Sequence, residues 1–157
     1  MRGNYPFKRI FDIIGACAGL LVIAPLTPFI AAAIVLDSRG PVCVGLERIS
    51  GGKTIKVYKF RSMVDGAEKM KAGLKRFNER TDGPFFKMKQ DPRITRVGKI
   101  LRKFRIDEFP QFINVLKGEM SLVGPRPHEP EEVAQYKPEH KRVTEARAGV
   151  TGLSQVS

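Results

Sequence analysis

The sequence predicts an α+β protein, mostly helical, from three patterns that follow one another along the chain. An uncharged apolar run occupies residues 13–36, a strand, turn and strand pattern follows at 42–60, and two helix patterns occupy 91–118. The 157 residues, 42% of them apolar, are enough for one compact domain and one attached segment. We therefore expect two parts, residues 1–37 and residues 38–157.

The apolar run is long enough to enter a membrane. Its 24 uncharged residues would extend about 36 Å as a helix, against about 30 Å for a hydrocarbon core. Pro25 and Pro28 lie near its middle, where each removes a backbone donor, so a sharp bend is expected. The run is then either a kinked span or a helix that dips into the bilayer and returns. Lys8 and Arg9 before it and Arg39 after it favour cytoplasmic ends.

Two other interpretations of this run fit less well. A buried helix of a soluble protein is rarely so long and so free of charge. A cleaved signal peptide would have Ala31–Ala33 as its cleavage site. The apolar region of a signal peptide is usually shorter than this run, and it is usually helical at its centre, where this run has prolines.

Basic residues dominate the charge, with 28 Lys and Arg against 16 Asp and Glu. Only three of the basic residues precede residue 38, so the charge lies in the second part. An anionic partner is expected: nucleic acid, an acidic membrane or a phosphorylated small molecule. The absence of a P-loop, a GxGxxG motif and interleaved aromatic residues argues against nucleotide-binding folds and nucleic acid. Two cysteines and two histidines are too few for a disulfide framework or a His/Cys zinc site.

A small β-hairpin is expected after the apolar run. Strands at 42–49 and 53–60 are joined through Ser50-Gly51-Gly52, which is a turn pattern. A short helix is expected at 65–78. Residues 119–130, EMSLVGPRPHEP, are dense in Gly and Pro and are expected to form a rigid loop.

Two helices are expected in the second half of the chain. Asp91 as N-cap and Pro92 as the first helical residue begin one that reaches Phe104. Its apolar residues recur at spacings of three and four and its other faces are basic, so it is an amphipathic helix that suits either solvent or an anionic membrane interface. The second helix begins at Asp107 and ends at a cap on Gly118.

Asp107 and Glu108 are the candidate chemical centre. At a helix start, free amides and the helix dipole hold a carboxylate ionised, so helix capping by itself explains them well. The same position suits Mg²⁺ and phosphate groups. Basic residues flank the pair in sequence: Lys99, Arg102, Lys103 and Arg105 before it, and Arg126 after it. Such a set would stabilise charge on a diphosphate, and a carboxylate nucleophile would act by two displacements.

Five ordered stretches resemble the bacterial sugar transferases, the monotopic phosphoglycosyl transferases. They are GPV (40–42), YKFRSM (58–63), DPRITRVGKILR (91–102), DEFPQFINVLKGEMSLVGPRP (107–127) and GVTGLSQV (149–156). The resemblance runs from about Phe7 to the last residue. It implies a re-entrant membrane helix broken at Pro25 on the cytoplasmic face of the bacterial inner membrane, followed by a cytosolic catalytic domain over 38–157 that is shorter at its C-terminus than is usual for the family.

The resemblance also implies an activity and a set of site residues. Asp107 matches the nucleophile that attacks the β-phosphate of a UDP-sugar and releases UMP, and Glu108 matches its partner. Polyprenyl (undecaprenyl) phosphate then accepts the phosphosugar, in the first membrane step of exopolysaccharide, capsule, O-antigen or glycoconjugate synthesis. Mg²⁺ is expected on Asp107 and Glu108. The expected substrate-binding residues are Lys59, Arg61, Arg102, Pro125, Arg126 and Pro127.

Some positions depart from the family pattern. Ala24 stands where many members have Ser before the proline, and Phe109 stands where Leu usually follows the dyad. The competing hypothesis is a membrane-anchored basic module that binds acidic lipid or nucleic acid without catalysis. Either protein could form oligomers.

Overall fold

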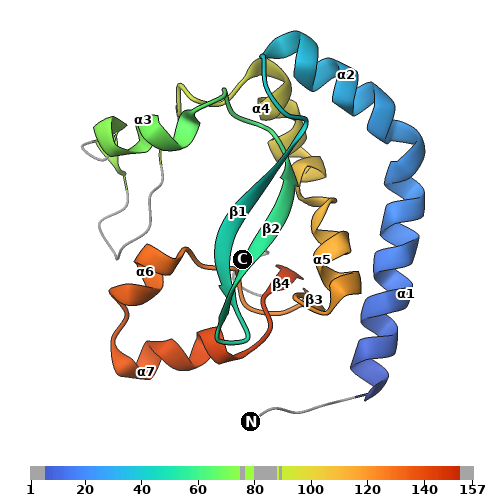
Figure 1. Ribbon diagram of the computed structural model, residues 1–157, viewed down its shortest axis with the longest axis vertical. Coiled ribbons are helices and arrows are strands. Elements are labelled where there is room, and N and C mark those ends of the chain that lie inside the picture. The colour runs from blue at the N-terminus through green and yellow to red at the C-terminus, as the bar shows by residue number, and fades with distance from the viewer. Residues whose placement is uncertain (1–5, 75–76, 80–87, 89, 153–157) are drawn as a thin grey trace.

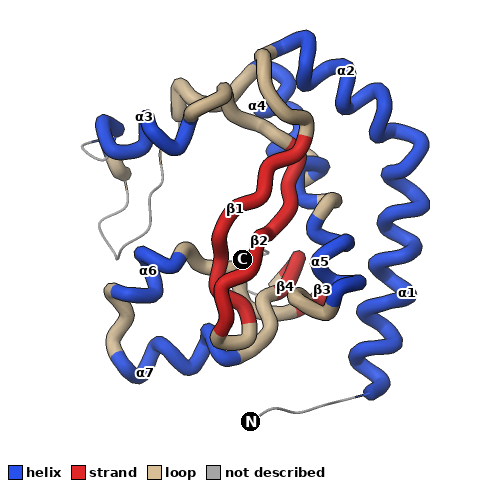
Figure 2. The backbone as a smooth tube through the Cα atoms, in the orientation of Figure 1, coloured by secondary structure: helices blue, strands red, loops and turns tan. Residues whose placement is uncertain are grey.

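The α+β class is confirmed in the computed structural model, which describes residues 6–74, 77–79, 88 and 90–152. A long β-hairpin lies at the centre, a bent pair of helices runs along one side, and shorter helices surround the hairpin (Figure 1). Figure 2 shows the hairpin and a second, very short pair of strands, which form the two sheets of the described residues. Helix is therefore more abundant than strand, as predicted.

The apolar run forms two helices with a bend between them, at the place that the prolines predict. Helix α1 covers Pro6–Ile23, a 3₁₀ turn covers Ala24–Leu26, and helix α2 covers Thr27–Asp37. Pro25 lies in the 3₁₀ turn, and Pro28 lies in the first turn of α2, where a missing amide costs no hydrogen bond.

Thr27 satisfies the carbonyl groups that the bend leaves open. Its amide donates to the Ala24 carbonyl, and its hydroxyl donates to the Ile23 carbonyl at 3.0 Å. A hydroxyl group therefore supports the break, and it comes from the residue between the two prolines, since position 24 is alanine.

Phe7–Asp37 is long and apolar enough to cross a membrane, with a mean hydropathy of 2.4. Large apolar side chains point outward on both helices; the most exposed are Phe7, Phe11, Leu21, Phe29 and Leu36. This supports membrane association by length and composition alone, so the re-entrant path stays a prediction.

The hairpin forms within one residue of its predicted limits, and Ser50, predicted to lie in the turn, ends the first strand. Strand β1 covers Cys43–Ser50 and pairs with β2, Lys53–Phe60, in an antiparallel register that opposes Ser50 and Lys53. The two residues between them, Gly51 and Gly52, have φ angles of 58° and 73°. A two-residue turn with both φ angles positive is type I′, which strongly favours glycine.

One face of the hairpin is turned toward the helices. Side chains alternate between the two faces of a strand, and the register places on this face Val44, Leu46, Arg48, Ile55, Val57 and Lys59. All six are buried or half-buried, and Val57 is fully buried. A basic residue from each strand therefore shares the apolar, inward face.

Helix α5, Gln111–Lys117, is attached to the outer edge of β2 by a buried asparagine. The Asn114 side chain accepts from the Tyr58 amide at 3.0 Å and donates to the Lys56 carbonyl at 2.7 Å. It thus pairs with the strand edge as another strand would. The helix ends at Gly118, with φ 80°, as predicted.

Helix α1 packs on α5 through polar contacts near its start and close packing farther along. Arg9 donates to the Val115 and Leu116 carbonyls at 2.6 and 2.8 Å, which belong to the last turn of α5, where a cation is favourable. At Gly19, any Cβ atom would collide with the ring of Phe112. One face of α1 therefore packs against the domain core.

Helix α4, Arg96–Lys103, begins later than predicted, and Asp91 is not its N-cap. The carboxylate of Asp91 instead binds the Arg93 guanidinium at 2.6 Å. The Thr95 side chain accepts from the Gly98 amide at 2.9 Å and caps the helix. The carboxylate of Asp37, the last residue of α2, accepts from the Val97 amide in the first turn of α4 at 2.8 Å. The C-terminal end of α2 therefore meets the N-terminal end of α4.

Residues 121–123 are a strand, so the prediction of a loop over 119–130 is wrong there. Strand β3, Ser121–Val123, pairs in parallel with β4, Gly149–Thr151. The partner lies far along the chain, which local composition cannot reveal. At Gly149 a Cβ atom would overlap the backbone of Gly124, so glycine permits this close contact.

The remaining helices lie away from the bent pair (Figure 1). Helix α3 covers Ala67–Leu74, within the predicted 65–78. Helix α6 covers Pro130–Ala134, α7 covers Pro138–Lys141, and a 3₁₀ turn follows at Arg142–Glu145.

Candidate active site

Asp107 and Glu108 lie in a 3₁₀ turn, Ile106–Glu108, that connects α4 to α5. Pro110 serves as the N-cap of α5, so the pair precedes this helix and does not occupy its first turn. Arg105, just before the turn, has a φ angle of 55° and is the non-glycine residue with positive φ among the described residues. A left-handed conformation costs a residue with a side chain roughly 1–2 kcal/mol, so the chain is strained beside the dyad.

Asp107 is buried, with only 6% of its surface exposed. Burial raises the pKa of its carboxyl above the usual value, while Lys59 acts to lower it, Glu108 to raise it and Arg102 to lower it. The pKa is therefore shifted opposite to the direction expected for a carboxylate at a helix start, because loss of water outweighs the helix amides and the neighbouring cations.

Glu108 is held by Lys59 from strand β2. The Lys59 ammonium lies 2.8 Å from the Glu108 carboxylate, and each side chain is 25% exposed. Lys59 is on the inward face of the hairpin, and Asn114 fixes β2 against α5. These two contacts place the second carboxylate of the dyad opposite a cation.

A cavity of about 360 Å³ joins most of the predicted site residues. It is lined by Lys59, Arg102, Asp107, Glu108, Arg126 and Pro127, which were predicted as site residues, and by Arg105, which was expected among the basic residues near the dyad. Arg48, Gln111, Val57 and Val150, which were not predicted, complete the lining. Residues from the hairpin, from α4 and α5, and from the Pro-Arg-Pro loop therefore line the same cavity.

Pro125 supports the loop from behind. Its carbonyl accepts a hydrogen bond from the Gly149 amide at 2.8 Å, and it does not line the cavity. Strand β4 therefore holds the Pro-Arg-Pro loop beside the dyad, which gives the GVT stretch a role that its sequence did not disclose.

Arg61 lies elsewhere, although it was expected to bind substrate. It is buried, and its guanidinium donates to the Ser38 hydroxyl at 2.9 Å and to the Ser38 carbonyl at 2.5 Å, with further contacts to the carbonyls of Ile34, Arg39 and Gly40. These groups form the C-terminal end of α2, where carbonyls lack helical partners and a cation is favourable. The structure therefore separates Arg61 from Lys59, two residues earlier.

Arg48 is a site residue that the sequence analysis missed. It shares the inward face of the hairpin with Lys59 and donates to the Glu129 carboxylate at 3.2 Å. Burial tends to raise the pKa of Glu129, yet Lys71 and Arg48 hold it below its usual range. Strand alternation, counted from Lys59 across the turn, was the sequence signal that could have identified it.

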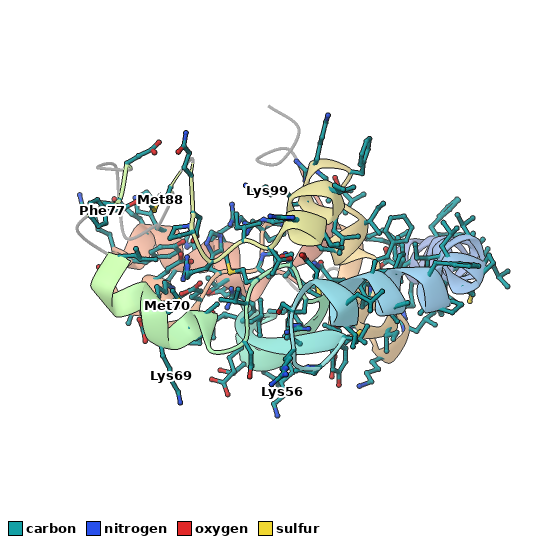
Figure 3. All side chains as sticks on the ribbon, turned by 90° about the horizontal axis from the view of Figure 1, so that it is seen from above. Lys56, Lys69, Met70, Phe77, Met88 and Lys99 are labelled. Atoms are coloured by element: carbon teal, nitrogen blue, oxygen red, sulfur yellow. The ribbon has the colours of Figure 1, made fainter. Side chains whose placement is uncertain are left out.

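The cavity gathers five basic side chains, whereas other lysines point away from it. Figure 3 shows Lys56 and Lys69 extending outward from β2 and α3, on the side away from Lys99 of α4. The five cavity residues are Arg48, Lys59, Arg102, Arg105 and Arg126. A cluster of cations around two carboxylates suits a diphosphate group, whose charge the cations would balance.

The two carboxylates fit a magnesium ion only in a restricted way. Across residues 6–74, 77–79, 88 and 90–152, no group of three or more His, Cys, Asp or Glu side chains could hold a metal. Mg²⁺ commonly binds through one or two carboxylates and completes its shell with phosphate oxygens and water. Asp107 and Glu108, on the same cavity wall, fit that pattern.

Comparison with known proteins identifies the family. The model of the bacterial sugar transferase family matches residues 3–157. Galactosyl transferase CpsE of Streptococcus agalactiae serotype III (strain NEM316) is 45% identical over 96% of this chain and 33% of its own length. Undecaprenyl-phosphate glucose phosphotransferase of Komagataeibacter xylinus is 41% identical over 96% of this chain and 27% of its own length.

A shorter relative is covered more completely. Exopolysaccharide production protein PSS of Rhizobium leguminosarum bv. phaseoli is 43% identical over 95% of this chain and 72% of its own length. The chain thus spans about a third or less of the two longer relatives and most of this one. Because the family match covers nearly every residue, this chain belongs to the bacterial sugar transferase family.

Proposed function

We propose that this chain is the catalytic part of a phosphoglycosyl transferase that moves a sugar 1-phosphate from a UDP-sugar to polyprenyl (undecaprenyl) phosphate. The observation that carries the proposal is Asp107, a buried carboxylate of raised pKa in a cavity lined by five basic side chains. The names of the relatives agree with it, since one is an undecaprenyl-phosphate glucose phosphotransferase and another an exopolysaccharide production protein. The product would be the first lipid-linked intermediate of a surface polysaccharide or glycoconjugate.

In the first displacement, a carboxylate oxygen of Asp107 attacks the β-phosphorus of the UDP-sugar. A bond forms between that oxygen and phosphorus, and the bond from phosphorus to the oxygen bridging the α-phosphate breaks, so UMP leaves with the electron pair. Lys59, Arg102 and Arg126 line the cavity and balance the negative charge that shifts onto UMP. Burial of Asp107 limits hydrolysis of the aspartyl phosphosugar by water.

In the second displacement, a phosphate oxygen of polyprenyl phosphate attacks the same phosphorus and the carboxylate leaves. Glu108, held by Lys59 at 2.8 Å, is placed to take the proton of a singly protonated acceptor. Asp107 and Glu108 are the residues that would hold Mg²⁺, which, when bound, neutralises charge on the phosphate oxygens.

The activity is tested by incubating the protein with Mg²⁺, a panel of UDP-sugars and polyprenyl phosphate and measuring UMP. We expect UMP release and, without acceptor, an intact protein heavier by one phosphosugar. Asp107→Asn is expected to abolish both. If Asp107→Asn releases UMP as fast as the parent, the assignment of the nucleophile is wrong. The non-catalytic membrane module predicts no UMP at all and binding that weakens steeply with salt.

We also propose that the bent helix pair enters the membrane and returns to the cytoplasmic face. The bend at Pro25 and the junction of both helix ends with the domain support this path, since Arg9 binds α5 and Asp37 caps α4. Cysteine labelling in sealed vesicles tests it, using the exposed Cys43 and Phe7→Cys in a Cys17→Ser background. A membrane-impermeant reagent should label both positions from the same side. Labelling from opposite sides would show a spanning helix.

A further inference from the structure

A second, smaller cavity lies beside the one that contains the dyad. Its volume is about 160 Å³, and it is lined by Arg105, Glu108, Phe109, Phe112, Val150 and Thr151. Arg105, Glu108 and Val150 line both cavities, so the two adjoin at the dyad. The small cavity is largely apolar, whereas charged and polar side chains dominate the large one.

Two aromatic rings connect the small cavity with the membrane helix. Phe109 and Phe112 meet edge to face, with ring centroids 5.4 Å apart and planes at 87°. The ring of Phe112 also lies against Gly19 of α1, where a Cβ atom would collide with it. One side of this ring therefore faces the apolar helix, and the same side chain forms a wall of the cavity.

Arg105 lies where the polar and the apolar cavity adjoin, in the strained conformation described above. Glycine would adopt a φ angle of 55° without strain. Strain of this kind concentrates at functional sites, where the side chain has a use. An arginine beside an apolar cavity suits an anionic group attached to an apolar chain.

We infer that the small cavity binds the first isoprene units of the polyprenyl phosphate acceptor, with Arg105 binding its phosphate; this inference rests on the proposed function. The uracil, ribose and sugar of the donor carry polar groups that need hydrogen-bonding partners, which the Phe109, Phe112 and Val150 side chains do not offer. An isoprenyl phosphate matches both the apolar wall and the adjacent cation.

Binding of the acceptor in the small cavity would place its phosphate for the second displacement. The acceptor phosphate would lie at the boundary of the two cavities, next to Arg105 and Glu108, which line both of them. One of its oxygens forms a bond to the phosphorus of the aspartyl phosphosugar, and the bond from phosphorus to Asp107 breaks. The electron pair returns to the carboxylate, and the proton of a singly protonated acceptor passes to Glu108.

The test measures the two half-reactions separately, as UMP release without acceptor and as transfer of labelled phosphosugar from the protein to polyprenyl phosphate in detergent micelles. Thr151→Trp places a large ring in the cavity from an exposed position. We expect the ratio of transfer rate to UMP-release rate to fall at least tenfold. Thr54→Trp adds the same ring at an exposed strand position that lines neither cavity, and should leave the ratio as in the parent.

Arg105→Gly is the second variant, because it removes the guanidinium together with the strain. Its thermal midpoint should equal or exceed that of the parent, while the KM for polyprenyl phosphate rises at least tenfold. An unchanged ratio in Thr151→Trp and an unchanged KM in Arg105→Gly would overturn the inference. So would an equal slowing of both half-reactions, which would assign the cavity to the donor. If the parent protein releases no UMP, the proposed function is wrong, which is a different result from failure of this inference.

Discussion

Asp12 and Asp107 are buried to the same degree, with 5% and 6% of their surfaces exposed, but their surroundings differ. Asp12 joins α1 to β3: it accepts from the Ser121 hydroxyl and the Leu122 amide, both at 2.9 Å, and pairs with Lys8 at 3.5 Å. Asp107 lines a cavity, and burial raises its pKa despite Lys59 and Arg102.

The difference shows how the two regions use a buried charge. A carboxylate that is surrounded by donors and a cation fixes the geometry of a junction, because removing either partner exposes the other to an unfavourable apolar environment. A carboxylate that faces a cavity keeps a desolvation cost, and such perturbed groups concentrate at functional sites. Burial alone therefore does not distinguish the proposed nucleophile from a structural aspartate, whereas burial together with a cavity and a raised pKa supports the proposal.

The largest expected effect separates the two aspartates by activity. Asp107→Asn should reduce UMP release by a factor on the order of 10³ or more, because it replaces the nucleophilic carboxylate with a neutral amide. Asp12→Asn should leave the rate per folded molecule within a few-fold of the parent. Both rates are measured by UMP release at matched protein concentrations. An equal loss in Asp12→Asn would show that the α1 junction takes part in the chemistry.

The next effect separates the same two positions by stability. Asp12→Ala should lower the free energy of unfolding by about 3 kcal/mol, because Ser121, Leu122 and Lys8 lose their acceptor. Asp107→Asn should raise stability at neutral pH. Denaturant titration in detergent micelles, followed by circular dichroism, measures both changes.

The pH dependence of the Asp107→Asn effect follows from the raised pKa of Asp107. The folded state binds the proton more tightly than the unfolded state, so the stability of the parent falls as pH rises from the unfolded pKa to the folded pKa. The gain in free energy of unfolding that Asp107→Asn brings should thus be present at neutral pH. It should decrease as pH falls from the folded pKa of Asp107 to its unfolded pKa. A gain that is independent of pH would contradict the buried, desolvated carboxylate.

A smaller effect distinguishes the two basic residues of the YKFRSM stretch. Arg61→Ala should lower the free energy of unfolding by about 2 kcal/mol, because the carbonyls at the end of α2 lose a charged donor. The KM for the UDP-sugar in its folded fraction should remain that of the parent. Lys59→Ala should instead raise this KM, since Lys59 lines the large cavity. If Arg61→Ala raises the KM as much as Lys59→Ala does, Arg61 acts on the substrate.

The smallest effect concerns the bend. Thr27→Val should cost about 1 kcal/mol, because the Ile23 carbonyl loses the Thr27 hydroxyl in an apolar environment. Thr27→Ser keeps the hydroxyl and should retain most of the parent stability, as measured by thermal denaturation in micelles. Equal stability of the valine and serine variants would show that the hydroxyl does not support the bend.

Features that depend on neighbouring residues were predictable. Prolines placed the bend of the apolar run, and Gly51 and Gly52 placed the hairpin turn, because both act through their own φ angles and amides. The start of α4 was not predictable in the same way. Asp91 and Thr95 are both good N-caps, and the choice between them depends on Arg93, which occupies the Asp91 carboxylate.

The sequence by itself determined the order of the elements, the break in the apolar run, the basic character of the second part and the Asp107 and Glu108 pair. Only the tertiary structure decided that Asp107 is buried in a cavity, that Arg48 joins Lys59 there, and that Arg61 is used to cap α2. The reason is that burial and charge pairing depend on residues far apart in the chain. Local spacing limits which groups are present, and packing determines which of them meet.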